Sequence, residues 1–154
     1  MKKIKKAVVV MALLSFLFGC NKTPEYSIDD IQSVSISCGH MDNSFSYSFY
    51  LRKNDDKWFL DAQFCIDSQS PQIEYENHHI EKEDVDELLN IMKEQEIIEK
   101  VQTYKEKKSN IIISDETIYC TSILFKDGEM IMAKKQISQD LTNYFYSLAE
   151  KYAE

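Results

Sequence analysis

The chain has 154 residues, of which 26 are acidic and 18 are basic, and its formal net charge is −8. This length predicts one domain that buries about two thirds of its unfolded surface, enough for a core without disulfides. An acidic surface repels a polyanion, so the composition argues against nucleic acid as a partner.

The first twenty residues have the order of a secretory signal. Four lysines precede an apolar run from Ala7 to Phe18, which ends in Gly19 and Cys20. The run is shorter than the roughly 20 apolar residues that cross a bilayer. Removing residues 1–19 takes away these lysines and no acidic residue, so the net charge moves from −8 to −12 over 135 residues. The lysines are Lys2, Lys3, Lys5 and Lys6.

The sequence Leu17-Phe18-Gly19-Cys20 resembles the lipobox of bacterial lipoproteins, in which a signal peptidase cleaves before a cysteine that carries diacylglycerol. The resemblance implies that residues 1–19 are removed and that Cys20 is lipidated. Two or three acyl chains would anchor the protein stably at the extracytoplasmic face of the cell membrane, because each buried methylene contributes about 0.8 kcal/mol. Residues 20–29 then form the lipidated cysteine and a tether, and residues 30–154 form a single domain.

Apolar and polar side chains alternate over residues 31–66, which predicts antiparallel strands separated by polar turns. Serines 33, 35 and 37 lie opposite the apolar face of the first strand. Cys38 and Cys65 fall on opposite faces of the sheet, so we expect no disulfide between them. The expected strands are 31–38, 45–51, 58–66 and a short fourth strand at 73–75.

The apolar spacing becomes helical over residues 81–101, where acidic side chains in the first turns favour the positive end of the helix dipole. A second hairpin follows, with strands at 119–125 and 131–133. Its turn contains Asp127-Gly128, a strong hairpin signal because glycine accepts a positive φ without strain.

The last helix is expected at 138–153, with Ser138 as its N-cap. The element order is therefore β-β-β-α-β-β-α, with the fourth strand as an addition. This order predicts an α+β fold, a two-layer sandwich in which an antiparallel sheet of five to six strands carries two helices on one face.

The segments Asp115-Glu116-Thr117-x-Tyr119 and Phe125-x-Asp127-Gly128 are similar to those of small uncharacterised secreted lipoproteins of low-GC bacteria. This resemblance brings no activity with it. Beyond residue 19 the chain has two glycines, Gly39 and Gly128, too few for a phosphate-binding loop or a dinucleotide fingerprint. The nucleophile-elbow, β-lactamase and zinc-protease motifs are also missing, which argues against the common hydrolase classes.

The densest group of possible metal ligands is Glu74-x-Glu76-x-His78-His79. Adjacent histidines on an extended backbone point to opposite sides, so they do not readily share one tetrahedral ion. Spacing fixes no third strong ligand. We therefore favour a solvated segment before an acidic helix start, and expect neither metal nor another cofactor.

Three cysteines remain if Cys20 is lipidated: Cys38, Cys65 and Cys120. They allow one disulfide with one free thiol, or three free thiols. Cys38 and His40 are two residues apart and could form a dyad, but a nucleophile also needs an orienting acid and an oxyanion hole, which the sequence does not indicate. Buried structural cysteines are the favoured interpretation.

Four tyrosines fall off the predicted apolar faces and are the candidate binding residues, since exposed tyrosine gives interfaces contact area at low entropic cost. Ordinary cross-strand packing is the alternative. The sequence thus predicts a lipid-anchored, non-catalytic binding module with a protein or glycan partner. An inhibitor or immunity-type lipoprotein, or a thiol- or histidine-dependent hydrolase, are the other hypotheses. The tyrosines are Tyr50, Tyr75, Tyr104 and Tyr146.

Overall fold

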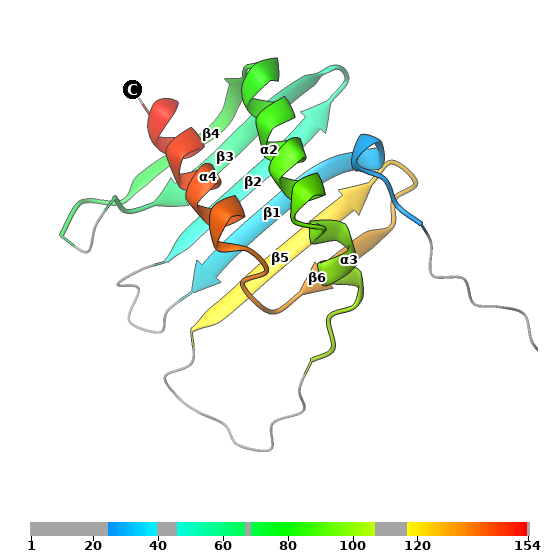
Figure 1. Cartoon of the computed structure of the whole chain (residues 1–154). Helices are drawn as coiled ribbons and strands as arrows, with labels where there is room; N and C mark the ends of the chain where they lie inside the picture. The colour runs from blue at the N-terminus through cyan, green and yellow to red at the C-terminus, as the bar shows by residue number, and fades with distance from the viewer. Residues whose placement is uncertain (1–24, 40–45, 67–68, 107–116, 154) are drawn as a thin grey trace, which may run out of the picture.

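A computed structural model describes residues 25–39, 46–66, 69–106 and 117–153 (Figure 1). Within these ranges the chain forms one six-stranded antiparallel sheet and three α-helices, which confirms the predicted α+β class. The elements are η1 (Ile28–Asp30), β1 (Ile31–Gly39), β2 (Tyr47–Asn54), β3 (Lys57–Phe64), β4 (Ile73–Ile80), α2 (Lys82–Glu94), α3 (Ile97–Gln102), β5 (Ile118–Phe125), β6 (Met130–Ala133) and α4 (Gln139–Lys151).

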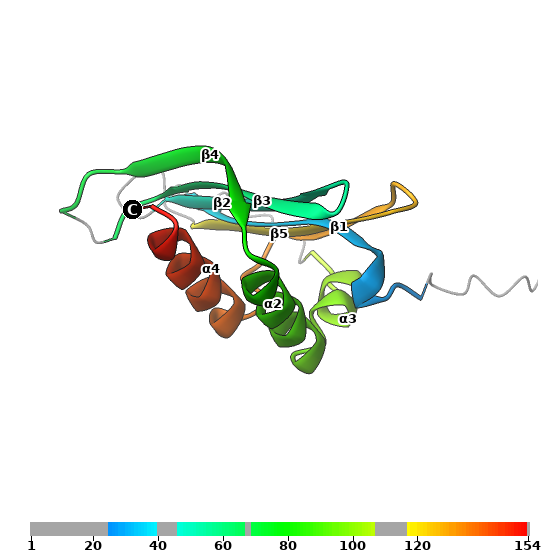
Figure 2. The same cartoon turned by 90° about the horizontal axis from the view of Figure 1, so that it is seen from above.

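The strands lie in the order β4-β3-β2-β1-β5-β6, so β4 and β6 are the two edges of the sheet. Figure 2 shows α2, α3 and α4 together on one side of the sheet. We call this side the covered face and the opposite side the open face. None of the helices in the described ranges is long and apolar enough to span a bilayer.

The core lies between the sheet and the helices, where the apolar side of each strand meets the apolar stripe of each helix. Phe49 is at its centre and is fully buried. Its ring centroid lies 5.7 Å from those of both Phe64 and Phe145, so β2, β3 and α4 are joined by aromatic contacts. Burying these large rings supplies much of the hydrophobic stabilisation.

Two local predictions are confirmed at single residues. The hydroxyl of Ser138 accepts a hydrogen bond from the backbone N–H of Leu141 at 3.1 Å, so Ser138 is the N-cap of α4. Gly128 has a φ of 87° in the β5–β6 turn, where its N–H donates to the Phe125 carbonyl at 3.0 Å. An N-cap and a positive φ are both determined by a few neighbouring residues, which is why the sequence reveals them.

The predicted helix over 81–101 is two helices, α2 and α3, because the chain turns at Glu96. Glu96 has a φ of 52°, in the left-handed region that interrupts a right-handed helix. The apolar period continues across the turn since Met92, Ile97 and Val101 are all buried. The pattern therefore hides the break.

The predicted strand boundaries at 66 and 75 are also wrong. β3 ends at Phe64, and Ile66, expected on the apolar face, is 58% exposed. β4 extends to Ile80, beyond the expected 73–75, since an irregularity opposite Leu60 and Ala62 shifts its register. That shift breaks the alternation by which a strand is recognised.

Candidate functional site

The open face carries the side chains that alternate with the core residues of each strand. None of the described helices packs on it, as the edge-on view in Figure 2 shows. Its members by strand are Ser33, Ser35 and Ser37 on β1, Ser48, Tyr50 and Arg52 on β2, Phe59, Asp61 and Gln63 on β3, Glu74, Asn77 and His79 on β4, Cys120, Ser122 and Leu124 on β5, and Met130 and Met132 on β6.

Arg52 is the centre of a polar network on this face. Its guanidinium donates hydrogen bonds to a carboxylate oxygen of Asp61 on β3 and to the side-chain oxygen of Asn77 on β4. The backbone N–H of Asn77 donates to the other Asp61 oxygen at 2.7 Å. The side chains of Arg52 and Asp61 are 25% and 28% exposed, so the pair is half-buried. Three strands thus hold one guanidinium in a fixed position.

The network depends on an irregularity in β4. Asn77 has a φ of 57°, at the register shift opposite Leu60 and Ala62. Asparagine adopts this left-handed conformation more readily than most residues. The turn of the backbone aims the Asn77 N–H at Asp61, and bulges commonly redirect groups in this way beside functional sites.

Aromatic rings flank the guanidinium. The Arg52 Cζ lies 5.6 Å from the ring centroid of Tyr50, a cation–π contact. Phe59 pairs with Arg52 on one side and with His79 on the other, and its ring lies 5.8 Å from the His79 ring, edge to face. We call this contiguous group the Arg52 patch, consisting of Tyr50, Arg52, Phe59, Asp61, Asn77 and His79.

Small polar residues separate the Arg52 patch from an apolar strip. Ser35 lies opposite Tyr50 on one side, and its hydroxyl lies 2.8 Å from that of Ser122 on the other. Beyond Ser122, Met132 is 47% exposed and Met130 is 55% exposed. The open face therefore has three parts: a fixed polar and aromatic patch, a flat serine-lined middle and an apolar edge.

Three of the four candidate tyrosines, Tyr75, Tyr104 and Tyr146, pack against the core, so their expected position off the apolar faces is wrong. Tyr75 and Tyr146 pack against the core: the Tyr75 hydroxyl donates to the Ala149 carbonyl at 3.1 Å, and the Tyr146 ring meets Phe49 edge to face at 5.0 Å. Burial raises the pKa of each hydroxyl to about 12. The Tyr104 hydroxyl bonds to the Lys134 carbonyl, and only Tyr50 lies on the open face.

The four possible metal ligands on β4 do not form a centre. His78 lies opposite Leu60 on the covered face and contacts the ring of Tyr152, with centroids 5.1 Å apart, whereas His79 is on the open face beside Phe59. Glu74 and Glu76 are exposed. Within the described ranges no three His, Cys, Asp or Glu side chains are grouped to hold a metal ion. The opposed directions of the two rings follow from the extended backbone between them.

The three cysteines beyond the predicted lipidation site are free thiols. Cys38 is buried on the covered face, and burial raises the pKa of its thiol. Cys120 lies opposite Ser37 on the open face and is half-buried. The ring of His78 contacts the rings of Tyr75 and Tyr152, and the ring of His79 contacts that of Phe59. His40, the other member of the possible Cys38 dyad, lies outside the described residues, as does Cys20.

Two surface grooves flank η1. One, of about 620 Å³, lies between residues 25–29 and the α2–α3 segment; the other, of about 570 Å³, lies between η1, the β2–β3 turn and the start of α2. Their described linings share Ile28 and Asp29 and contain one histidine, His79, and no cysteine. Neither groove brings a thiol to an imidazole, the pair that a thiol-dependent hydrolase needs. The lining of the second groove does place His79 with the carboxylates of Asp56 and Glu81, the combination on which the histidine-dependent alternative depends.

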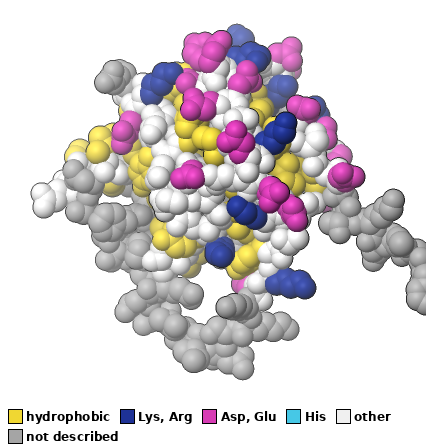
Figure 3. Space-filling view, in the orientation of Figure 1, with side chains coloured by type: hydrophobic (Ala, Val, Ile, Leu, Met, Phe, Trp, Pro, Cys, Tyr) yellow, Lys and Arg dark blue, Asp and Glu magenta, His cyan; other side chains and the backbone are white. Residues whose placement is uncertain are grey.

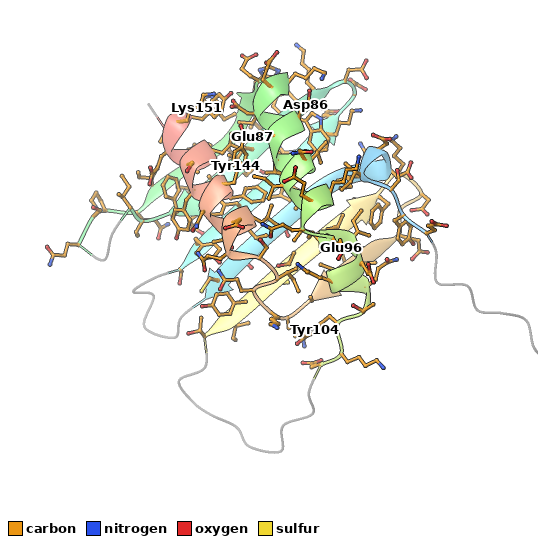
Figure 4. All side chains as sticks on the ribbon, in the orientation of Figure 1. Asp86, Glu87, Glu96, Tyr104, Tyr144 and Lys151 are labelled. Carbon is orange, nitrogen blue, oxygen red and sulfur yellow. The ribbon has the colours of Figure 1, made fainter. Side chains whose placement is uncertain are left out.

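Sequence reasoning missed another cluster, in which Asp84 joins α2 to α4. Asp84 accepts hydrogen bonds from Lys151 Nζ at 2.7 Å and from the Tyr152 hydroxyl at 2.6 Å. Tyr144 donates to the Asp84 carbonyl at 2.9 Å, and Figure 4 shows it between the helices near Glu87. Burial alone raises the pKa of Asp84, but the bonds from Lys151 and Tyr152 outweigh it and lower that pKa. Every group here is satisfied within the fold, so the cluster fastens two helices together.

The outer surface of the helices, as far as Figure 3 shows it, has no patch of a single residue type. In Figure 3 acidic and basic side chains are interspersed over the helices, with apolar side chains between them. Mixed charge of this kind is ordinary for a solvated surface. It contrasts with the Arg52 patch, where the charged groups bond to one another beside exposed rings.

Arg52, Asp61 and Asn77 were not among the residues singled out from the sequence. Arg52 falls at the start of the expected turn over 52–57, and β2 instead continues to Asn54. The available signal was the spacing of Tyr50 and Arg52, two residues apart on the polar side of a strand.

Comparison of the chain with protein-family models, with curated proteins and with solved structures finds no match.

Proposed function

We propose that this protein is a lipid-anchored, extracytoplasmic binding module that receives a protein partner on its open face and performs no catalysis. The Arg52 patch is the observation that carries this proposal. It is the described group in which aromatic rings and a fixed guanidinium lie together on a surface that no described helix covers.

Arginine and tyrosine are enriched among the residues that dominate protein interfaces. Binding usually costs free energy because such long side chains lose their freedom. Here Asp61 and Asn77 already hold Arg52 in the unbound protein, and Phe59 and His79 support each other by ring contact. The patch therefore has little side-chain freedom left to lose on binding.

The charge around the patch favours a partner with a basic surface. Glu74 and Glu76 are exposed on β4, beside the patch, and the chain beyond residue 19 has a net charge of −12. Complementary charge speeds association and selects partners. An inhibitor or immunity-type lipoprotein, which occludes a basic enzyme or toxin, is the second candidate and is favoured by this same acidity.

The membrane anchor is a separate part of the proposal and rests on the resemblance of residues 17–20 to a lipobox. Labelling of cells with a palmitate analogue should mark the wild-type protein and leave Cys20→Ala unmarked. Equal labelling of both would remove the anchor from the proposal and would leave the open face to be tested by itself.

Binding is tested by affinity capture from cell-envelope extracts with wild-type protein, Arg52→Ala and a control, Lys100→Ala. Lys100 is exposed on α3, away from the open face. We expect a protein captured by wild type and by the control to be reduced at least tenfold with Arg52→Ala, as for a residue worth more than about 1.4 kcal/mol in binding. Equal capture by all three, or capture of a glycan instead of a protein, would contradict the proposed partner.

A further inference from the structure

The two edge strands of the sheet, β4 and β6, differ in how readily they could pair with a further strand. The β4 edge has exposed Glu74 and Glu76 and the left-handed turn at Asn77, all of which discourage pairing with another strand. The β6 edge has the sequence Met130-Ile131-Met132-Ala133, without charge, proline or bulge. An apolar edge of this kind is a template for strand addition.

The backbone of β6 shows which of its groups are available. The Phe125 N–H donates to the Glu129 carbonyl at 3.0 Å, so residues 125 and 129 form a hydrogen-bonded pair. Hydrogen-bonded pairs alternate along an antiparallel ladder, so Ile131 and Ala133 also bond to β5. The N–H and C=O groups of Met130 and Met132 consequently point away from β5, toward the side of β6 on which no other described strand lies.

We propose that β6 pairs with β6 of a second copy of this chain, antiparallel about a two-fold axis perpendicular to the sheet, to give one continuous twelve-stranded sheet. The register that uses every outward group places Ile131 opposite Ile131. Met130 of each copy then exchanges two backbone hydrogen bonds with Met132 of the other, which makes four across the axis. Such self-complementarity is what a two-fold interface requires.

The charges that flank β6 favour this antiparallel arrangement. Exposed Glu129 precedes the strand, and exposed Lys134 and Lys135 follow it. In the antiparallel pair Glu129 lies opposite Ala133 of the second copy, so the two lysines of that copy lie immediately beyond it, and the same occurs at the other end. A parallel pair would instead set like charges side by side, which is unfavourable.

Exposed apolar side chains beside the axis add hydrophobic contact. Met130 and Met132 are 55% and 47% exposed on the open face, and pairing sets Met130 of each copy against Met132 of the other. A four-residue ladder is at the small end for a stable interface. Confinement of both copies to one membrane surface would raise their effective concentration.

The register predicts a position-specific crosslink. Two differently tagged full-length copies are co-expressed, one Met130→Cys and the other Met132→Cys, and membranes are oxidised. Residues 130 and 132 of different copies are directly opposed and should form a disulfide, whereas two Met130→Cys copies have Cα atoms more than 7 Å apart and should not. Wild-type copies control for the native thiols.

A second measurement excludes chance collision and misfolding. Met132→Lys places a charge on the exposed edge and should weaken dimerisation of the detergent-solubilised full chain at least tenfold by sedimentation equilibrium, whereas Met132→Leu should not. Circular dichroism should show both variants folded. Equal crosslinking of same-position pairs, absence of any crosslink, or a crosslink to a different protein that adds its own strand would overturn the proposal.

Discussion

The two faces of the sheet are made by the same strands and have opposite compositions. On the covered face, Phe49, Leu60 and Phe64 are fully buried beneath the helices. On the open face their neighbours along the strands include Ser48, Tyr50 and Asp61. Alternation therefore separates the residues that stabilise the fold, on one side, from those to which the proposed function assigns recognition, on the other.

This separation explains how the open face can carry exposed polar and aromatic side chains without weakening the core. The strands beneath the Arg52 patch are held by the core, so the patch itself need not contribute much to folding. Changes on the covered face should therefore lower stability, and changes on the open face should lower binding. A residue whose substitution strongly lowered both stability and binding would contradict this separation of the two faces.

The largest effect should come from Phe49→Ala, which removes a fully buried ring that contacts Phe64 and Phe145. We expect a loss of about 3 to 5 kcal/mol in the free energy of unfolding, because the cavity adds to the lost transfer free energy. Chemical denaturation measures it. A loss below 1 kcal/mol would show that the helices do not seal this face.

Asp84→Asn should lower the free energy of unfolding by about 1 to 2 kcal/mol at neutral pH, because the bonds to Lys151 and Tyr152 are charge-assisted and partly exposed. The pKa of Asp84 is lowered in the folded protein, so its contribution is present above the ordinary value of 3.8 and is lost as the pH falls below it. The difference between wild type and variant should shrink on acidification to pH 3. A constant difference would contradict the ion pair.

Thiol reactivity compares the faces directly. Cys38 is 5% exposed on the covered face, with a raised pKa, while Cys120 is half-buried on the open face. Under native conditions Cys120 should alkylate at least tenfold faster than Cys38, because the thiolate is the reactive form and must be accessible. Mass spectrometry of peptides over time gives both rates. Equal rates in folded protein would mean that the covered face opens readily.

Tyr50→Ala should have the smallest effect on stability, below about 1 kcal/mol, since the residue is 38% exposed on the open face and its ring has a cation–π contact with Arg52. Chemical denaturation of Tyr50→Ala and Phe49→Ala under the same conditions measures the difference, because residues 49 and 50 are adjacent on β2 and point to opposite faces. A loss as large as that of Phe49→Ala would make Tyr50 part of the core.

The sequence allowed the fold to be predicted because its signals were local and periodic. Ser138 indicated the N-cap of the last helix and Gly128 indicated the hairpin turn. The alternation of apolar and polar residues along the strands indicated that one face of the sheet is covered. The break at Glu96 leaves the helical spacing of apolar residues intact, so the sequence does not reveal it. The bulge at Asn77 interrupts the strand alternation without a recognisable motif. Their conformations depend on contacts with distant parts of the chain, which a local pattern does not record.

The candidate site was harder to predict for the same reason. Arg52, Asp61 and Asn77 meet only because β2, β3 and β4 are neighbours in a particular register. The tyrosines were chosen for lying off the apolar stripe, yet Tyr146 fills a space between α4 and the sheet. A polar tip lets a tyrosine pack in a core while its hydroxyl reaches the rim.

Site-specific photocrosslinking in cells tests the central claim most directly, with a benzophenone side chain placed at Ser48 or, as a matched control, at Ser147. Both serines are exposed, Ser48 on the open face beside Tyr50 and Ser147 on α4. We predict a discrete crosslinked product with another protein from position 48, lost with Arg52→Ala, and none from position 147. The same product from both positions, or a product from position 147 alone, would contradict the assignment of recognition to the open face.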